Sequence, residues 1–464
     1  MQTPHFSIRL RAIGLVISAG AAITLTACNT SNSSNEPPAL KTLDGKAPLV
    51  IGHRGFPGLY PEETRPAYEG AADAGADSLE MDLHLSKDCV LMARHNPWLS
   101  DNTNIATVAL TNPAFAARKR TVPGVMVNVG YSTATYGGPA QYLSDLTDPK
   151  NQKSVLKSLV VDGEDHTGDW SITDFTAAEL KLIGGTTYDA RTERPTDQNG
   201  KNPILTMQEI IDIAKAKSTA TGRAITVYPE AKNPYWNNQQ AIANGCGAGA
   251  HPFEDAIIKL VNDNSLNSKT AAIFVQSFDP ASLKYMRTAG LNTRLIQLVD
   301  GNAVNYKTGE MIYVTNDSDN FVSGRPYSWT LAADGRFFGA MLTPAGLADI
   351  KTYADGIGPW KPQVMSLTIS PFKPTNADGT PYTGSLADVN TVVPTSLIAD
   401  AHKAGLFVHT YTFRNEQKYL AGFYKGDPAA EFLTFYRAGI DGVFTDFTNT
   451  GVAARATYLK EMGR

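Results

Sequence analysis

The feature that most constrains the fold is a repeated alternation of short apolar runs, rich in β-branched residues, with longer segments of helical pattern. This alternation favours a parallel sheet whose strands are joined by helices over an antiparallel sheet. The runs number eight, as many as the strands that close a (β/α)8 (TIM) barrel. They are Pro48 to His53, Ser78 to Leu85, Ala224 to Lys232, Ala271 to Phe278, Thr293 to Val299, Val364 to Ser370, Leu406 to Phe413 and Gly442 to Phe447.

Helical segments fit between several of these runs. One follows the first run, from Arg65 to Ala76. Three others end in glycine, which is a common stop signal for a helix. These three helices are expected to end at Gly290, Gly405 and Gly439.

One part of the chain departs from the alternation. The run from Cys89 to His95 follows the second strand too closely for a crossover helix, so it is expected to pair with that strand as a hairpin. The next segment, Asn96 to Pro203, is too long for a bare loop. We expect it to be an insertion folded over one end of the barrel. An independent second domain is the less favoured alternative, because the barrel pattern resumes beyond it.

The N-terminus has the layout of a secretory signal. Arg9 and Arg11 precede an apolar stretch from Ala12 to Ala27, and the stretch ends in Leu-Thr-Ala-Cys, which resembles the bacterial lipobox. This pattern predicts a lipoprotein signal peptide over 1–27, lipidation of Cys28, a flexible tether over 28–46 and a folded part over 47–464. The protein would then lie outside the cytoplasm, anchored to a membrane in the periplasm or at the cell surface. Ordinary secretion with cleavage nearby is the alternative.

Charge and cysteine content exclude some classes of function. The net charge is −4, so a protein that reads the phosphate backbone of nucleic acids is not expected. Besides Cys28, the chain has only Cys89 and Cys246, and neither has the spacing of a metal site. The sequence favours two buried free thiols over a disulfide between them.

Polar residues at strand ends are the candidates for chemistry, because a barrel of this type carries its active site at the carboxyl ends of its strands. Residues i and i+2 of a strand share a face, so Glu80 and Asp82 are expected to point together into the barrel, as are Glu230 and Lys232. Converging carboxylates repel one another unless a cation neutralises them. Three of them suit a hard divalent ion, Mg²⁺ or Ca²⁺. Ion pairs with Arg54 and Lys232 are the alternative reading.

Two histidines and two cations complete this set. His53 and His95 also end strands, and they supply two groups that titrate near neutral pH, as a general acid and a general base require. Arg54 and Lys232 only donate hydrogen bonds, which suits an anionic, oxygen-rich group such as a phosphodiester. Together these residues indicate cleavage of a phosphodiester assisted by a metal ion.

The same residues carry a resemblance to a known family. The motifs "HRG", "PEET", "GADSLEMDLHLSKD", "RH" and "YPEAK", followed by "VQSF", "YTFRNE" and "GIDGVFTDF", are similar in content and order to those of the glycerophosphodiester phosphodiesterase family. The forms "YTFR" and "GVFTDF" resemble its secreted bacterial branch. The resemblance implies a phospholipase-C-like phosphodiesterase barrel, and a hydrolase that converts deacylated phospholipids into sn-glycerol 3-phosphate and an alcohol such as choline or ethanolamine.

The resemblance also implies a role for each matching position. It makes Glu80, Asp82 and Glu230 ligands of one divalent cation, His53 and His95 the acid-base pair, and Arg54 and Lys232 contacts of the phosphate. Glu62 is expected near the glycerol, or else as a charge at a helix N-terminus. Gln276 is expected to orient substrate or water, or else to bond within the barrel.

The sequence differs from the family pattern at two positions and is compatible with two alternative functions. The family commonly has asparagine at Glu63 and aspartate at Asn96, and both positions are expected near the mouth of the barrel. One rival is a phosphodiesterase that acts on intact or lyso-phospholipids, similar to a lysophospholipase D. The other is a non-catalytic surface lipoprotein that binds a ligand.

Overall fold

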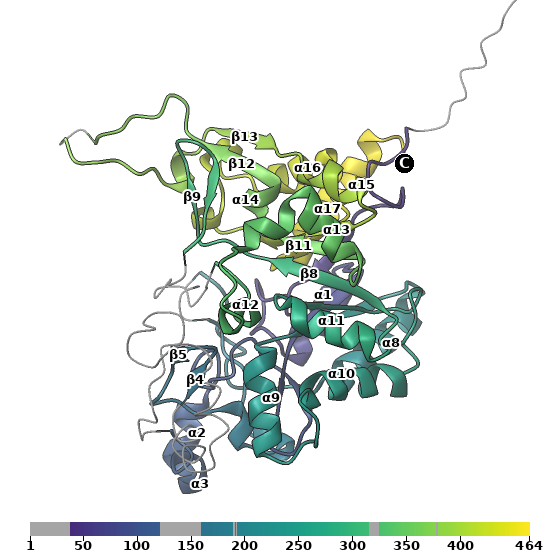
Figure 1. Cartoon of the computed structure of the whole chain (residues 1–464), viewed down its shortest axis with the longest axis vertical. Coiled ribbons are helices and arrows are strands. Elements are labelled where there is room, and N and C mark those ends of the chain that lie inside the picture. The colour runs from purple at the N-terminus through teal and green to yellow at the C-terminus, as the bar shows by residue number, and fades with distance from the viewer. Residues whose placement is uncertain (1–37, 121–158, 189–190, 192, 315–323, 377–378) are drawn as a thin grey trace, which may run out of the picture. The chain divides into compact units, whose positions relative to one another are not determined.

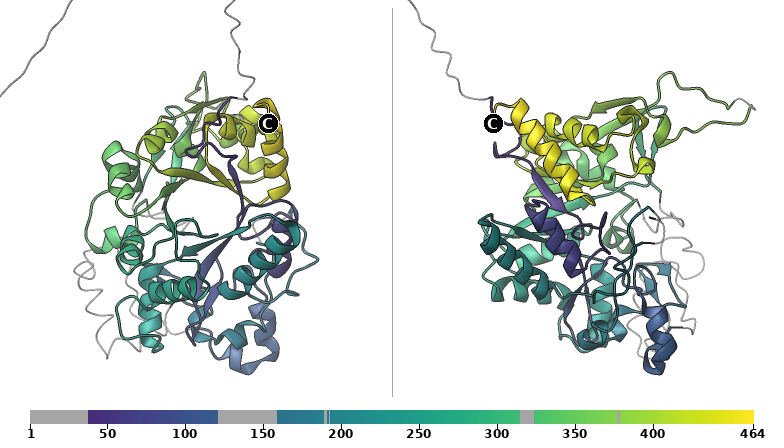
Figure 2. Two further views of the ribbon diagram at one scale, coloured as in Figure 1. Left: turned by 90° about the vertical axis from the view of Figure 1, so that its right-hand side faces the viewer. Right: turned by 180° about the vertical axis from the view of Figure 1, so that it is seen from behind.

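The computed structural model describes residues 38–120, 159–188, 191, 193–314, 324–376 and 379–464. Its largest sheet has nine strands, of which eight are parallel and form a closed barrel in which β1 pairs with both β2 and β15 (Figures 1 and 2). The barrel strands are β1 (Leu49–Gly52), β2 (Ser78–Leu85), β6 (Thr226–Ala231), β7 (Phe274–Ser277), β8 (Arg294–Val299), β11 (Gly356–Pro359), β14 (Phe407–Phe413) and β15 (Gly442–Thr445). The TIM barrel predicted from the sequence is confirmed.

Helices surround the ring of strands (Figure 2). Those between or after barrel strands are α1 (Arg65–Asp73), α8 (Met207–Thr221), α9 (Pro234–Ala243), α10 (Pro252–Asp263), α11 (Pro280–Thr288), α12 (Tyr327–Leu331), α13 (Pro344–Lys351), α14 (Lys361–Val364), α15 (Leu397–Lys403), α16 (Pro428–Ala438) and α17 (Thr448–Glu461). Gly290, Gly405 and Gly439 each adopt a positive φ just past a helix, as a glycine stop requires.

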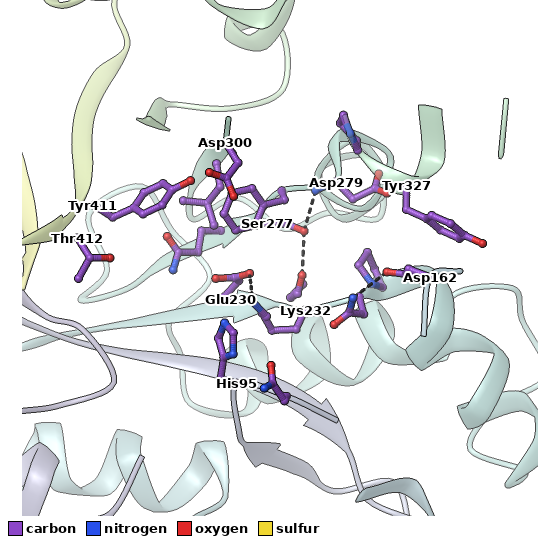
Figure 3. A pocket seen from close by; sticks show the side chains of 18 of the residues that line it. His95, Asp162, Glu230, Lys232, Ser277, Asp279, Asp300, Tyr327, Tyr411 and Thr412 are labelled. Carbon is purple, nitrogen blue, oxygen red and sulfur yellow. Dashed lines mark hydrogen bonds and ion pairs between the residues drawn. The ribbon is translucent and has the colours of Figure 1, made fainter. Parts of the chain in front are cut away.

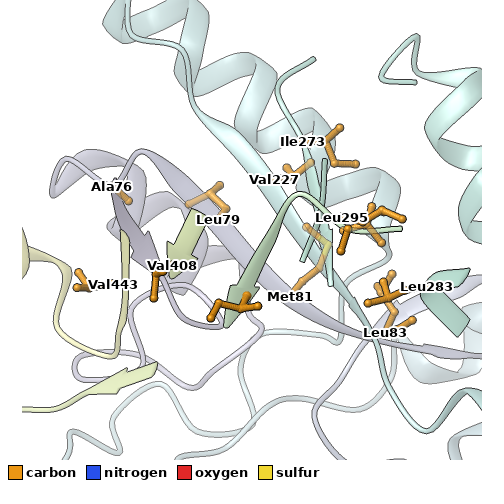
Figure 4. Packing of buried hydrophobic residues seen from close by; sticks show 14 of the residues in the cluster. Ala76, Leu79, Met81, Leu83, Val227, Ile273, Leu283, Leu295, Val408 and Val443 are labelled. Carbon is orange, nitrogen blue, oxygen red and sulfur yellow. The ribbon is translucent and has the colours of Figure 1, made fainter. Parts of the chain in front are cut away.

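Side chains alternate between the two faces of each strand and so form two cores. On β2, Leu79, Met81 and Leu83 point outward and belong to a large buried cluster between strands and helices (Figure 4). Other residues of the barrel strands form a small, separate apolar cluster, which we call the floor of the barrel. The floor consists of Ile51, Tyr228, Phe274, Ile296 and Phe444, with His409 packed among them.

The sixth barrel strand differs from the prediction. The run that was expected to form it contributes β12 (Met365–Thr368), which pairs outside the barrel with β13 (Thr391–Pro394). The barrel position belongs to β11, whose sequence is Gly-Ile-Gly-Pro. A Cβ atom at Gly356 would lie 2.8 Å from the backbone oxygen of Phe407, so close packing against β14 favours a glycine there. A short strand of this composition carries no apolar periodicity, which is why the sequence pattern missed it.

The segment after β2 contains a hairpin strand, which is followed by the insertion. The short strand β3 (Leu91–Ala93) pairs antiparallel with β2, as predicted. The described parts of the insertion contain α2 (Ile105–Thr111), α3 (Pro113–Ala116), β4 (Val160–Val161), β5 (Glu164–Asp165) and α7 (Ala177–Leu180). Their apolar residues form a cluster of their own, and this cluster also includes Met92 of β3 and Trp236 of α9. The insertion is therefore packed onto the barrel.

Cys89 and Cys246 form a disulfide, with 5.4 Å between their Cα atoms. The expectation of two buried free thiols was wrong, and neither cysteine is fully buried. The bond joins the turn between β2 and β3 to the segment after α9. The sequence did not reveal it because 157 positions separate the two cysteines.

The folded part begins before the predicted boundary at residue 47. Leu40 and Thr42 are buried, and the Leu43 N–H donates to Asp441 Oδ1 over 2.6 Å. Residues from Leu40 onward thus belong to the barrel and not to a tether. The predicted signal peptide and Cys28 lie outside the described residues. No helix within the described residues is both long and apolar enough to cross a membrane.

Candidate active site

A cavity of about 490 Å³ opens at the carboxyl ends of the strands. Its walls come from several strand ends, from the insertion and from the loops after β7 and β8. Figure 3 shows Glu230, Lys232 and His95 in one part of the cavity, with Asp300, Tyr411, Asp279, Tyr327 and Asp162 around them. We call this end of the barrel interior the mouth, defined by His53, Arg54, Glu80, Asp82, His95, Glu230, Lys232 and Asp446.

The structure brings the three predicted carboxylates together. Glu80, Asp82 and Glu230 are all buried, and one carboxylate oxygen of each lies within 4.8 Å of the other two. The parallel register of β2 and β6 places Asp82 directly beside Glu230. Burial raises the pKa of Glu230 to about 8, and the nearby Asp82 adds to this effect. Burial and Asp82 also raise the pKa of Glu80.

This set of donors fits a hard divalent cation. Carboxylates that repel one another in a buried site are stabilised when such an ion binds between them. Gln276 adds a further oxygen, because its Nε2 donates to Glu80 Oε1 over 3.2 Å while its Oε1 is buried with no hydrogen-bond partner among the described residues. Gln276 thus lies beside the carboxylates and forms a hydrogen bond within the barrel, which was the alternative to a role in orienting substrate or water.

Arg54 and Lys232 lie against the same carboxylates. Arg54 Nε is 2.9 Å from Asp82 Oδ2, and its backbone N–H donates to Glu80 Oε2 over 2.7 Å. Lys232 Nζ is 3.4 Å from Glu230 Oε1. The ion pairs that the sequence offered as an alternative to a metal site therefore exist alongside the carboxylate cluster. Burial opposes ionisation of Asp82, but Arg54 and Lys232 hold its pKa below the usual range.

His53 is held by a partner that sequence reasoning missed. Its Nδ1 lies 2.6 Å from Oδ1 of Asp446, which follows β15 and is fully buried. Asp446 Oδ2 accepts from Arg194 over 2.7 Å and from Arg414 over 2.8 Å. Burial alone would raise the pKa of Asp446, but these two arginines hold it well below its usual range. The ionised carboxylate therefore fixes the proton of His53 on Nδ1 and leaves Nε2 as an acceptor.

The pKa of each of the two histidines is lowered. Burial and the neighbouring Arg54 lower the pKa of His53 to about 4, although Asp446 opposes this shift. Burial, Arg54 and Lys232 lower the pKa of His95 well below its usual value. Both rings line the cavity. The structure thus places the two predicted histidines in one cavity beside the carboxylates.

Glu62 and Glu63 lie deeper than expected, since neither lines the cavity. Glu62 accepts hydrogen bonds from Arg54, Asn102 and Arg191. It therefore holds the Arg54 side chain in place and does not face the cavity. Burial would raise the pKa of Glu62, but Arg54 and Arg191 together lower it to about 2. Glu63 accepts from the Asp82 N–H over 3.0 Å and from the Tyr68 hydroxyl over 2.9 Å. The departure at Glu63 thus bears on the carboxylate cluster and not on the cavity wall.

The residues that were missed come from distant parts of the chain. Asn102, Arg191 and Arg194 belong to the insertion, and nothing local in the sequence links them to the mouth. Asp446 did carry a signal, because it directly follows a predicted strand in the same way as His53 does.

Comparisons with known proteins place the chain in a family. Residues 53–450 match the Glycerophosphoryl diester phosphodiesterase family. The chain belongs to this family. It is an enzyme of that family, similar over most of its length to proteins of plants and bacteria. It is 30% identical to the glycerophosphodiester phosphodiesterase GDPD6 of Arabidopsis thaliana over 419 residues, which cover 88% of this chain and 86% of the relative.

A bacterial relative and two solved structures are similar over comparable lengths. The glycerophosphodiester phosphodiesterase of Haemophilus influenzae is 23% identical, with 94% of this chain and 97% of the relative covered. A putative glycerophosphoryl diester phosphodiesterase from Silicibacter pomeroyi has a TM-score of 0.48 at 16% identity, and the match covers 90% of this chain and 98% of the other. An Oleispira antarctica phosphodiesterase in complex with the product sn-glycerol-3-phosphate has a TM-score of 0.44 at 14% identity. This match covers 89% of this chain and 98% of the other.

Proposed function

We propose that this protein hydrolyses glycerophosphodiesters to sn-glycerol 3-phosphate and an alcohol, and that it does so with one divalent cation and the pair His53 and His95. The observation that carries the proposal is the ion pair between His53 and Asp446 in the same cavity as the three carboxylates. A protein that only bound a ligand would need neither the oriented histidine nor the second one.

The division of labour between the histidines follows from their partners. His53 Nε2 is the free acceptor, and Asp446 stabilises the imidazolium that forms when His53 takes up a proton. His53 therefore acts first as the base. It takes the proton of the glycerol hydroxyl next to the phosphate, and the hydroxyl oxygen forms a bond to phosphorus as the bond to the alcohol breaks.

His95 completes the step as the acid. It gives a proton to the departing alkoxide, and Arg54 and Lys232 stabilise the negative charge on the phosphate oxygens. The bound phosphodiester is itself anionic, and its charge raises the pKa of the His95 ring, so that His95 carries the proton that it gives to the alkoxide. A water molecule then opens the cyclic phosphate, with the roles of the two histidines reversed. A cation bound by Glu80, Asp82 and Glu230 would supply additional positive charge to the phosphate.

An assay with three substrates tests this function. The purified protein is incubated with glycerophosphocholine, glycerophosphoethanolamine or lysophosphatidylcholine, each with Mg²⁺, with Ca²⁺ or with a chelator. We expect glycerol 3-phosphate from the first two substrates, and no product with the chelator. Preferred release of choline from lysophosphatidylcholine would instead support the rival lysophospholipase D activity, and no turnover of any substrate would support the binding protein.

We also propose that the protein is a lipoprotein outside the cytoplasm, anchored through Cys28. Two observations support this location: the N-terminal pattern of Arg9 to Cys28, and the disulfide between Cys89 and Cys246, since such bonds persist in oxidising compartments. Metabolic labelling with a fatty acid tests it. Labelled protein in the membrane fraction is expected, and Cys28→Ser should abolish the label.

A further inference from the structure

Two residues of the mouth lie just beyond the strands that carry them. The ladder between β2 and β3 ends at Ala93, and His95 comes two residues later. The strand β6 ends at Ala231, and Lys232 is the next residue. The strand ladders therefore end before His95 and Lys232, although the Arg94 N–H still donates to the Asp82 backbone oxygen over 2.7 Å.

His84 supplies the bond to His95. It shares the inward face of β2 with Glu80 and Asp82, and it is fully buried. Its Nε2 lies 3.2 Å from the backbone oxygen of His95. Because a carbonyl oxygen only accepts hydrogen bonds, the ring proton of His84 lies on Nε2, and its Nδ1 is left as an acceptor.

Asn237 connects this ring to Lys232. Its Nδ2 donates to His84 Nδ1 over 2.8 Å and to the Lys232 backbone oxygen over 2.7 Å, and it makes a longer contact of 3.4 Å with the Asn233 backbone oxygen. Its Oδ1 accepts from the Leu85 N–H over 3.2 Å, and this third bond fixes which way the amide points. Asn237 is fully buried, so water does not compete for these bonds.

We infer that His84 and Asn237 are positioning residues, which hold the backbones of His95 and Lys232 at a fixed separation for the reaction. The inference rests on the proposed function, since it gives His95 and Lys232 roles in hydrolysis. The chain of bonds runs from the His95 carbonyl through the His84 ring and the Asn237 amide to the Lys232 carbonyl. Neither positioning residue lines the cavity, so both act through the residues that they hold.

Single variants give the first test, with glycerophosphocholine and Mg²⁺ or Ca²⁺ as the assay. His84→Leu removes both bonds of the ring, and we expect kcat to fall about 10- to 100-fold with a smaller change in KM, because displaced groups lose reactivity more than binding. His84→Gln keeps an N–H near the His95 carbonyl and should recover part of the loss. His409→Leu is the matched control, because His409 is equally buried but lies in the floor, and it should retain near-normal kcat.

A double-mutant cycle with His95→Ala separates positioning from a purely structural role. If His84 acts through His95, then His84→Leu should lower kcat little further once His95 is alanine. Multiplied losses in the double variant would overturn the inference, as would a normal kcat in a folded His84→Leu protein. If His84→Leu does not fold, then His84→Gln and Asn237→Ala take its place in the cycle. Failure of the proposed function is distinct, because in that case the unmodified protein would not turn over the substrate.

Discussion

The floor and the mouth lie in the interior of the same barrel and share the strands β1, β6 and β15, yet they are chemically opposite. Each region contains a buried histidine whose pKa burial lowers to about 4, namely His409 in the floor and His53 in the mouth. His409 Nδ1 lies 2.9 Å from the Tyr228 hydroxyl, among aromatic rings. His53 is paired instead with the Asp446 carboxylate and opens onto a cavity.

This comparison shows that a shifted pKa does not by itself identify a functional histidine. Burial shifts both rings alike, and only the partner and the access to a cavity differ. The neutral Tyr228 hydroxyl forms a hydrogen bond with the His409 ring, whereas the Asp446 carboxylate would stabilise the positive charge of His53 after it takes up a proton. We therefore expect substitutions at the mouth to abolish activity and substitutions in the floor to change stability alone.

The largest effect is expected from the two histidines of the mouth. His53→Ala and His95→Ala should each lower kcat about 10²- to 10⁴-fold, because each removes a group that transfers a proton. His409→Gln should leave kcat within a few-fold of normal. Steady-state assays on glycerophosphocholine, with circular dichroism to verify folding, check all three. Near-normal activity of either alanine variant would remove that residue from the mechanism.

Replacement of the partner of His53 should change both the rate and its pH dependence. In Asp446→Asn the Nδ1–H loses its carboxylate, so kcat/KM should fall about 10²-fold or more. The pKa of His53 should also fall, because Asp446 opposes the effect of burial. A base must be neutral to act, so the acid limb of the profile of kcat/KM against pH should move to lower pH. Movement of this limb to higher pH would contradict the assignment of His53 as the base.

In the floor, protonation of His409 at low pH is expected to lower the free energy of unfolding. An exposed histidine titrates near 6.5 in the unfolded chain, whereas His409 in the folded protein has a pKa of about 4. The unfolded state therefore binds the proton first, and the free energy of unfolding falls as the pH drops from about 6.5 to 4. The contribution of His409 is on the order of 3 kcal/mol over this range.

His409→Gln removes this titration and should make the free energy of unfolding less dependent on pH. Urea unfolding of both proteins at pH 7 and at pH 4.5 measures the difference. An unchanged pH dependence would mean that the His409 ring is not buried as a neutral group.

The smallest effect on activity is expected from the disulfide. Cys89→Ser with Cys246→Ser should lower the free energy of unfolding by about 2 to 5 kcal/mol, because the bond closes a long loop in the unfolded chain. The bond lies outside the mouth, so kcat should change little at temperatures where the variant is folded. A large loss of kcat in the folded double variant would show that the bond also shapes the active site.

The sequence predicted those parts of the fold and the site that follow from local periodicity. Alternation within β2 and β6 was enough to place Glu80, Asp82 and Glu230 together, because a barrel strand has only two faces. The sequence pattern did not predict strand β11, because its closely packed positions are the glycines Gly356 and Gly358 and not large apolar residues. The sequence predicted most of the site residues at the strand ends, but it missed Asp446 and the residues on the insertion.

The missing residues illustrate what periodicity does not encode. Arg194 reaches Asp446 across 252 positions of sequence, and Cys89 reaches Cys246 across 157. These contacts depend on how the insertion and the loops pack against the barrel. The predicted end of the tether at residue 46 was wrong for the same reason, because Leu40 is buried and Leu43 bonds to Asp441 near the other end of the chain.

Calorimetric titration of Mg²⁺ and Ca²⁺ into the metal-free protein measures whether the carboxylates of the mouth bind a cation. We predict one ion per chain. We also predict that Glu80→Gln abolishes binding, because it removes one of the three carboxylates, and that His409→Gln leaves binding unchanged. Absence of binding by the unmodified protein, or unchanged binding by Glu80→Gln, would contradict the account.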